Sequence, residues 1–199
     1  MKKQEVLESL KDGLIVSCQA VPKEPHYMEG ITVKFAECAA WAGAKGIRAN
    51  SPEDIRAIKA QVDLPVIGIW KINRNVKDVY LTPNLEAAKA VWEAGAEIIA
   101  VQATHHYRDD GKLAYETIRE IKENIPEALI FADVSTAEDA RIAAEMGADF
   151  VAPTLAGYTK AGAFDKLEIK DAPDYILLRD IVDAVKGTGA RVIMEGKVA

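Results

Sequence analysis

The sequence predicts an α/β protein of the TIM (β/α)8 barrel class, C-terminally truncated after the seventh strand. Two observations indicate this class. A Gly-Ala phrase recurs along the chain, with glycines at 43, 95 and 147 that are 52 residues apart each time. Seven short apolar runs alternate with helical patterns, which is typical of a parallel sheet covered by helices.

The recurring phrase marks the points where a helix ends and a strand begins. It reads WAGAKGIR from residue 41, EAGAEIIA from residue 93 and EMGADFVA from residue 145. A glycine that follows a helical pattern is typical of a helix C-cap. A further apolar run follows each phrase, so each unit contains two strand–helix pairs.

The expected strands lie near residues 13–19, 45–49, 65–71, 97–103, 128–133, 149–155 and 191–195. Three polar phrases predict helix starts between them. Ser51-Pro52 offers a cap and a first-turn proline, Thr82-Pro83 repeats this pattern, and a capping box is expected from Ser135.

A doubly wound open sheet is the competing architecture. It normally has a glycine-rich phosphate turn after its first strand, where this chain reads QAVP at residues 19–22. Long linkers and low-complexity stretches are absent from the sequence, so we expect one barrel domain over residues 1–199. A fourth unit would require an eighth strand, and we expect this eighth βα unit to be missing because the sequence is truncated.

Composition restricts the partners of the protein. Hydrophobic residues make up 49% and charged residues 28% of the 199, the balance of a globular protein. The net charge of −6 argues against nucleic acid or an anionic membrane as the main partner. No apolar run approaches the roughly 20 residues of a membrane span, and the polar first residues lack the apolar core of a signal peptide. We therefore expect a cytoplasmic protein, with Cys18 and Cys38 as buried free thiols.

Two ionisable residues close apolar runs at strand ends, where this fold carries its chemistry. Lys71 could act as a general base or form a Schiff base with a carbonyl substrate. Its alternative role is structural, with the aliphatic stem covering the barrel rim. Glu195 precedes a glycine, which suggests a close backbone approach, although a surface carboxylate would look the same in the sequence.

Polar residues at other strand ends extend this pattern. Arg48 suits a hydroxylated or anionic ligand through paired donors, or a structural ion pair. Asp133 could face the same ligand or only favour a helix N-terminus. Gln19 offers neutral hydrogen bonds to a sugar, and Asn50 and Thr154 occupy equivalent positions.

Histidines and tryptophans do not suggest a further site. His105 and His106 are adjacent on a loop without paired carboxylates, so we expect no metal there. Trp41, Trp70 and Trp92 are expected to pack against helices and the barrel.

Several strings together resemble the N-acylglucosamine-6-phosphate 2-epimerase (N-acetylmannosamine-6-phosphate 2-epimerase) family. They are GLIVSCQA at 13–20, GIRAN at 46–50, PVIGIWK at 65–71, YLTP at 80–83, ADVST at 132–136, TLAGYT at 154–159 and EGK at 195–197. Gln102 departs from the family pattern, which usually has an aspartate there, and residues 72–74 read INR instead of Arg-Asp-Tyr. These departures concern contacts at the rim.

The resemblance implies an isomerase that inverts C2 of N-acetylmannosamine 6-phosphate to give N-acetylglucosamine 6-phosphate in sialic acid catabolism. It implies Lys71 as the base and Glu195 as the acid, with no metal or organic cofactor. It also implies two sets of binding residues, which are Gln19, Arg48, Asn50, Asp133, Thr154 and Tyr158 at the sugar and Gly196 and Lys197 at the phosphate. The expected partner is a small-molecule sugar phosphate, and a homodimer is one possible assembly.

The residue types suit this chemistry. Removal of the C2 proton beside an open-chain aldehyde gives an enolate, and inversion requires a proton from the opposite face. A base works best near the pH of the medium, so we expect the site to lower the pKa of Lys71 from about 10.4, with Arg48 repelling its charge. Two alternatives remain open: a Schiff-base aldolase or lyase that uses Lys71, and a non-catalytic fragment that binds sugar phosphates.

Overall fold

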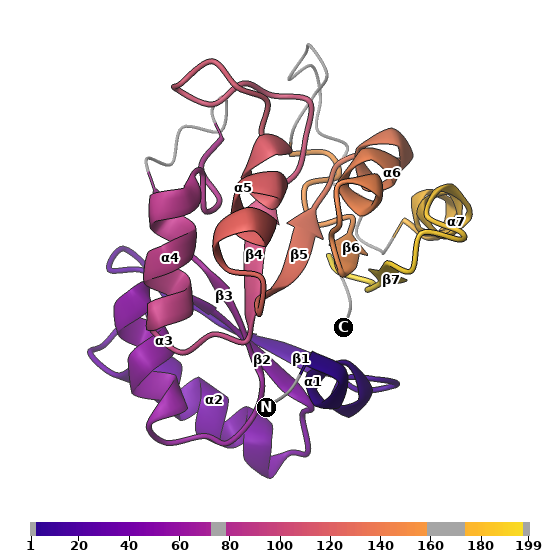
Figure 1. Ribbon diagram of the computed structural model, residues 1–199. Coiled ribbons are helices and arrows are strands. Elements are labelled where there is room, and N and C mark those ends of the chain that lie inside the picture. Colours follow the sequence, from indigo (N-terminus) through magenta and orange to yellow (C-terminus); the bar gives the residue numbers. More distant parts are fainter. Residues whose placement is uncertain (1–2, 73–78, 159–173, 197–199) are drawn as a thin grey trace.

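The computed structural model describes residues 3–72, 79–158 and 174–196 and contains a seven-stranded parallel sheet with helices between the strands (Figure 1). The strands are β1 Ile15–Cys18, β2 Gly46–Asn50, β3 Val66–Ile69, β4 Ile98–Gln102, β5 Leu129–Asp133, β6 Phe150–Ala152 and β7 Arg191–Val192. The helices are α1 Lys3–Ser9, α2 Ile31–Trp41, α3 Pro52–Lys59, α4 Leu85–Glu93, α5 Glu116–Asn124, α6 Ala137–Glu145 and α7 Tyr175–Ala184.

The strands follow one another in the sheet in chain order, from β1 to β7, and every neighbouring pair is parallel. A doubly wound sheet would reverse its strand order at a switch point, and this sheet does not. Figure 1 shows the helices on the outer side of the curved sheet, with α1 near the end where the strands begin. The fold is TIM-barrel-like, and all seven expected strands are confirmed.

Alternate residues of the strands belong to two separate apolar clusters. The inner cluster includes Ile67, Ile69, Ile98, Ala100, Leu129, Phe131, Phe150 and Ala152. Their strand neighbours, such as Val66, Ile99 and Ile130, pack with the helices in the outer cluster. Because both faces are buried, the strands read as nearly continuous apolar runs. Strand side chains alternate with a period of two, so every second residue faces the barrel interior.

The recurring glycines end their helices as predicted. Gly43, Gly95 and Gly147 have φ angles of 90°, 106° and 103°, in the region that favours glycine. In the first repeat the N–H groups of Gly43 and Ala44 each donate to a carbonyl of α2 at 3.0 Å. These are the two bonds of a Schellman motif, and the same pair recurs in the other repeats.

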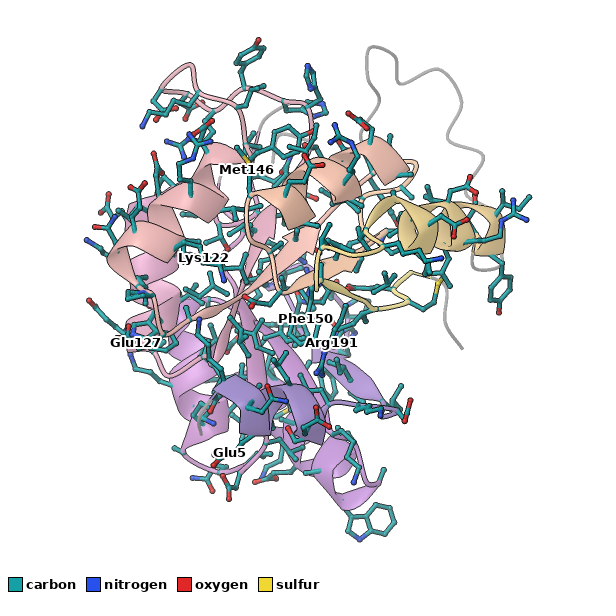
Figure 2. All side chains as sticks on the ribbon, turned by 45° about the vertical axis from the view of Figure 1, so that its right-hand side comes forward. Glu5, Lys122, Glu127, Met146, Phe150 and Arg191 are labelled. Atoms are coloured by element: carbon teal, nitrogen blue, oxygen red, sulfur yellow. The ribbon has the colours of Figure 1, made fainter. Side chains whose placement is uncertain are left out.

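The acidic residue after the second and third Gly-Ala pairs joins neighbouring units. Glu97 accepts a hydrogen bond from Lys59 Nζ at 2.7 Å and another from the N–H of Val66 at 2.9 Å. Asp149 accepts from Lys122 Nζ and from a backbone N–H of β5, both at 2.8 Å. Lys122 is labelled on α5 in Figure 2. Each acidic residue therefore joins the start of its own strand to the preceding strand of the sheet and to a helix.

Helix α1 covers the end of the barrel interior at which the strands begin. Val6 and Leu10 belong to the inner cluster, and Arg191 Nη1 donates to the carbonyl of Leu7 at 2.6 Å. Arg191 and Phe150 are register partners on β7 and β6 and lie side by side in Figure 2. Residues 3–9 are thus helical, and Val6 on this helix is buried.

Two helix starts differ from the prediction, whereas the start of α3 agrees with it. Helix α4 has Asn84 as its N-cap, with its side chain accepting the N–H of Ala87 at 2.9 Å, whereas the Thr82 hydroxyl accepts a hydrogen bond from Trp70. Helix α6 has its capping box one residue later than predicted, between Thr136 and Asp139.

The predicted burial was wrong for two side chains of α2. Both cysteines are free, but Cys38 is exposed while Cys18 is buried. Trp41 is 91% exposed, whereas Trp70 and Trp92 pack against the outer cluster as expected. Cys38 and Trp41 each lie two positions after a buried residue of α2, so they point about 200° away from the packed face.

None of the described helices is both long and apolar enough to span a membrane.

The glycine that ends α2 allows a test of the repeat. A Cβ added at Gly43 would meet no heavy atom within 4 Å, so Gly43→Ala isolates the strain of a positive φ. We expect a loss of about 1–2 kcal/mol in the free energy of unfolding, measured by urea denaturation. Gly43→Asn should lose less, because asparagine tolerates this conformation better. Equal stability of the wild type and Gly43→Ala would contradict the assignment.

Candidate active site

Polar side chains occupy the inward positions at the carboxyl ends of the strands. They are Gln19 after β1, Arg48 and Asn50 in β2, Lys71 after β3, Gln102 in β4, Asp133 in β5, Thr154 after β6 and Glu195 after β7. Lys71, for example, lies two residues beyond the inner residue Ile69, and Asp133 two beyond Phe131. Because all strands are parallel, these side chains gather at one rim.

Arg48 is the centre of this group. It is only 4% exposed. Its Nη1 donates to Glu195 Oε2 at 2.7 Å, and its Nη2 donates to both carboxylate oxygens of Asp133 at 2.8 Å. The guanidinium carbon lies 4.9 Å from the centre of the Phe131 ring, a cation–π contact. One buried cation therefore joins β2, β5 and the segment after β7.

Glu195 has an environment suited to holding a proton. Burial raises the pKa of its carboxyl above the ordinary range, and the nearby Asp133 carboxylate raises it further. Arg48, the hydroxyl of Thr154 and the positive charge of Lys71 act in the opposite direction but do not reverse this shift. Thr154 Oγ1 donates to Glu195 Oε2 at 3.2 Å. These surroundings favour the protonated form of the carboxyl more than solvent does.

Lys71 belongs to a second hydrogen-bonded group on the same rim. Its Nζ donates to Gln19 Oε1 at 2.6 Å, and Gln19 Nε2 donates to Ser17 Oγ at 2.8 Å. The backbone N–H of Lys71 donates to Asn50 Oδ1 at 2.9 Å. The amide oxygen of Asn50 therefore holds the main chain of the lysine.

A cavity of about 530 Å³ adjoins the Arg48 group. Arg48, Glu195, Gly196 and Phe131 line it together with residues of β1. Its volume is in the range of small-molecule sites. A buried cation and a carboxyl at its wall suit a hydroxylated or anionic ligand.

The remaining predicted residues have less defined surroundings. Tyr158 is 45% exposed in the turn after β6, and Lys197 lies outside the described residues. His105 is exposed, and His106 Nδ1 lies 2.9 Å from Thr104 Oγ1. Within the described part of the chain, no three His, Cys, Asp or Glu side chains are placed to hold a metal ion.

Two contributions were not foreseen from the sequence. Phe131 supports the guanidinium from below, and its inward position two residues before Asp133 is the signal that could have identified it. The Thr82 hydroxyl accepts the N–H of Trp70 at 3.1 Å, next to Lys71. Its position in a Thr-Pro pair suggested a helix cap instead.

The fold and the rim define a class of protein. The chain is a TIM-barrel-like protein with a lysine, an arginine and two carboxyl side chains at the carboxyl ends of its strands, as in enzymes of this fold.

Comparisons with known proteins identify the family. The model of the family described as "NanE: Putative N-acetylmannosamine-6-phosphate epimerase" matches residues 32–199. Two relatives are described as "Putative N-acetylmannosamine-6-phosphate 2-epimerase". That of Listeria welshimeri is 38% identical over 193 residues, 97% of this chain and 79% of the relative. That of Borrelia garinii is 41% identical over 194 residues, 97% of this chain and 81% of the relative.

Solved structures agree with this result. The N-acetylmannosamine-6-phosphate 2-epimerase from Clostridium perfringens superposes with a TM-score of 0.84 and 34% sequence identity, covering 96% of this chain and 80% of that chain. A deoxyribose phosphate aldolase from Aeropyrum pernix, at a TM-score of 0.62 and 16% identity over 98% of this chain and 85% of that chain, shares the fold alone. The chain belongs to the N-acetylmannosamine-6-phosphate epimerase family, whose named activity is that of an isomerase.

Removal of the central cation should destabilise the fold. Arg48→Met leaves the Asp133 carboxylate buried without its partner, and we expect a loss of about 3–5 kcal/mol in the free energy of unfolding. Adding Asp133→Leu should recover part of this loss, because both charges are then absent. Arg141→Met, which removes two exposed ion pairs, is the control and should leave the urea midpoint almost unchanged. A stable Arg48→Met single variant would contradict the assignment.

The hydroxyl of Thr154 should lower the pKa of Glu195. It donates to the carboxylate, so Thr154→Val should raise that pKa further, while Thr154→Ser should leave it close to the wild-type value. The midpoint can be measured by carbon-13 NMR of labelled glutamate, with the Glu195 resonance identified by its absence in Glu195→Gln. A lower midpoint in Thr154→Val would show that the hydroxyl does not stabilise the ionised form.

Proposed function

We propose that this chain is an epimerase that inverts C2 of N-acetylmannosamine 6-phosphate to give N-acetylglucosamine 6-phosphate, with Lys71 as the base and Glu195 as the acid. Membership of the family supports the reaction. One observation carries the assignment of residues: Lys71 and Glu195 follow β3 and β7 at the same rim of the parallel sheet. Side chains from two separate strands can reach the two faces of one sugar carbon.

The proposed reaction has two proton transfers. The neutral amine of Lys71 takes the proton from C2 of the open-chain sugar, and the electron pair of the C–H bond forms the enolate with the C1 oxygen. The carboxylic acid of Glu195 then donates a proton to the opposite face of C2, and the C1 aldehyde forms again. Lys71 ends as an ammonium and Glu195 as a carboxylate, and proton exchange with water restores both. The raised pKa of Glu195 supports the role of acid.

Arg48 has two roles in this proposal. It has five N–H donors, and those not used by Asp133 and Glu195 can hold the enolate oxygen as negative charge develops. When Glu195 donates its proton, the resulting carboxylate lies 2.7 Å from the guanidinium. The same cation thus stabilises both negative charges that the reaction creates. The repulsion of Lys71 by Arg48 is of less importance, because two carboxyl groups bind the guanidinium.

The other rim residues are proposed to bind the substrate. We assign Gln19, Asn50, Asp133, Thr154 and Tyr158 to the sugar and Gly196 and Lys197 to the phosphate. We further propose that residues 1–199 fold as one domain, which the single seven-stranded sheet supports.

The setting of the reaction is also a proposal. We propose a cytoplasmic enzyme of sialic acid catabolism, because a phosphorylated sugar is charged and does not cross a lipid bilayer unaided. A homodimer is the proposed assembly. Sedimentation at several protein concentrations tests the assembly.

The reaction is tested by isotope exchange. Incubation with N-acetylmannosamine 6-phosphate in heavy water should place deuterium at C2 and form N-acetylglucosamine 6-phosphate. Proton NMR and mass spectrometry measure both changes. Lys71→Ala should reduce exchange by about 10²- to 10⁴-fold, because the base is absent. Lys34→Ala, which removes an exposed lysine paired only with Glu37, is the control and should exchange at the wild-type rate.

Three outcomes would contradict the proposal. Full exchange in Lys71→Ala would remove the assigned base. A covalent adduct trapped by borohydride in the presence of substrate would favour the Schiff-base aldolase. Binding of the substrate without any exchange in the wild type would identify a non-catalytic binding protein.

A further inference from the structure

The segment that carries Lys71 lies beyond the parallel sheet. Strand β3 ends at Ile69, and Lys71 instead forms an antiparallel bridge with Leu81. The N–H of Ile72 donates to the carbonyl of Tyr80 at 2.9 Å. The position of Lys71 therefore depends on what fixes the returning segment at residues 80–82.

Gln102 fixes that segment from β4. Its backbone N–H donates to the carbonyl of Leu81 at 3.0 Å. Its side-chain Oε1 accepts the N–H of Tyr80 at 3.1 Å, and its Nε2 donates to Thr104 Oγ1 at 3.1 Å. The backbone N–H of Tyr80 can only donate, so the amide oxygen must face it, and the orientation of the amide is determined. The side chain is 1% exposed, which leaves it little freedom to move.

The two sides of the Lys71 segment are held by different residues. Asn50 Oδ1 accepts the N–H of Lys71, and Thr82 Oγ1 accepts that of Trp70. These contacts hold the outgoing segment directly. Gln102 acts on the returning segment and reaches Lys71 indirectly, through the bridge to Leu81 and the bond between Ile72 and Tyr80.

We propose that Gln102 is a positioning residue for Lys71: by holding Tyr80 and Leu81 against β4, it sets the direction in which the lysine amine points into the barrel mouth. The expected effect on activity rests on the proposed function, whereas the expected effect on the position of the lysine amine does not. A shift of about 1 Å in a catalytic group can reduce a rate by about a hundredfold. The loss should therefore appear in kcat, because the contacts of the Arg48 group with the substrate remain in place.

The kinetic test compares four variants. Gln102→Leu has a similar volume but no amide, and kcat should fall on the order of 10- to 100-fold with KM nearly unchanged. Gln102→Glu keeps an acceptor for Tyr80 and should recover most of kcat. In Gln102→Asn the shorter side chain does not reach the N–H of Tyr80, so this variant should behave like Gln102→Leu. It serves as the test if Gln102→Leu does not fold. Thr104→Val removes the partner of the Gln102 amide nitrogen, together with the contact to His106, and should keep kcat close to the wild-type value.

A second measurement does not require substrate. Acetic anhydride labelling of Lys71, quantified by peptide mass spectrometry against the exposed Lys89, reports the freedom of the amine that now donates to Gln19. The labelling rate of Lys71 should rise in Gln102→Leu and Gln102→Asn and stay low in Gln102→Glu and Thr104→Val.

Two results would overturn the proposal. In the first, folded Gln102→Leu or Gln102→Asn keeps both the wild-type kcat and the wild-type labelling rate. In the second, Thr104→Val loses as much activity as they do, which would assign the effect to the loop after β4. If Lys71→Ala proves fully active, the proposed function fails, and the labelling rates still decide whether Gln102 positions Lys71.

Discussion

The site depends on the period of two along parallel strands. Every second side chain faces the barrel interior, and on β3 to β6 these positions are apolar up to the level of Phe131. One step further toward the carboxyl ends, the same face carries Lys71, Gln102, Asp133 and, after β7, Glu195. A shift of one residue in any strand would turn its polar group into the layer between sheet and helices. Seven strands therefore fix the site through their register.

Arg48 holds the carboxyl groups of this rim together. A buried guanidinium is tolerated only with partners that satisfy its charge and its donors, and Asp133 and Glu195 supply them from β5 and from beyond β7. The two carboxyl groups differ in surroundings, because Glu195 also contacts Thr154 and borders the cavity. The structural ion pair and the candidate acid are thus parts of one network. For this reason the position of Arg48 at a strand end fitted both a structural ion pair and a ligand contact.

Much of the fold was predictable from local patterns, and the errors have local causes. The three glycines with positive φ end helices as the repeat indicated, because only the backbone conformation decides their role. The exposure of Trp41 and Cys38 was not foreseen, because residue type suggests burial while the helix face decides it. The Thr-Pro pair at residue 82 predicts a helix cap, but the Thr82 hydroxyl accepts the N–H of Trp70. A local pattern cannot reveal a competing partner twelve residues earlier in the chain.

The sequence by itself determined the seven strands, their order of appearance and the residue types at their ends, because hydrophobic period and turn chemistry are local properties. It could not decide which of those ends meet. The pairing of Arg48 with groups 85 and 147 residues away, the contact between Lys71 and Gln19, and the orientation of the Gln102 amide depend on closure of the strands into one curved sheet. They are long-range contacts, and only the tertiary structure brings their partners within hydrogen-bonding distance.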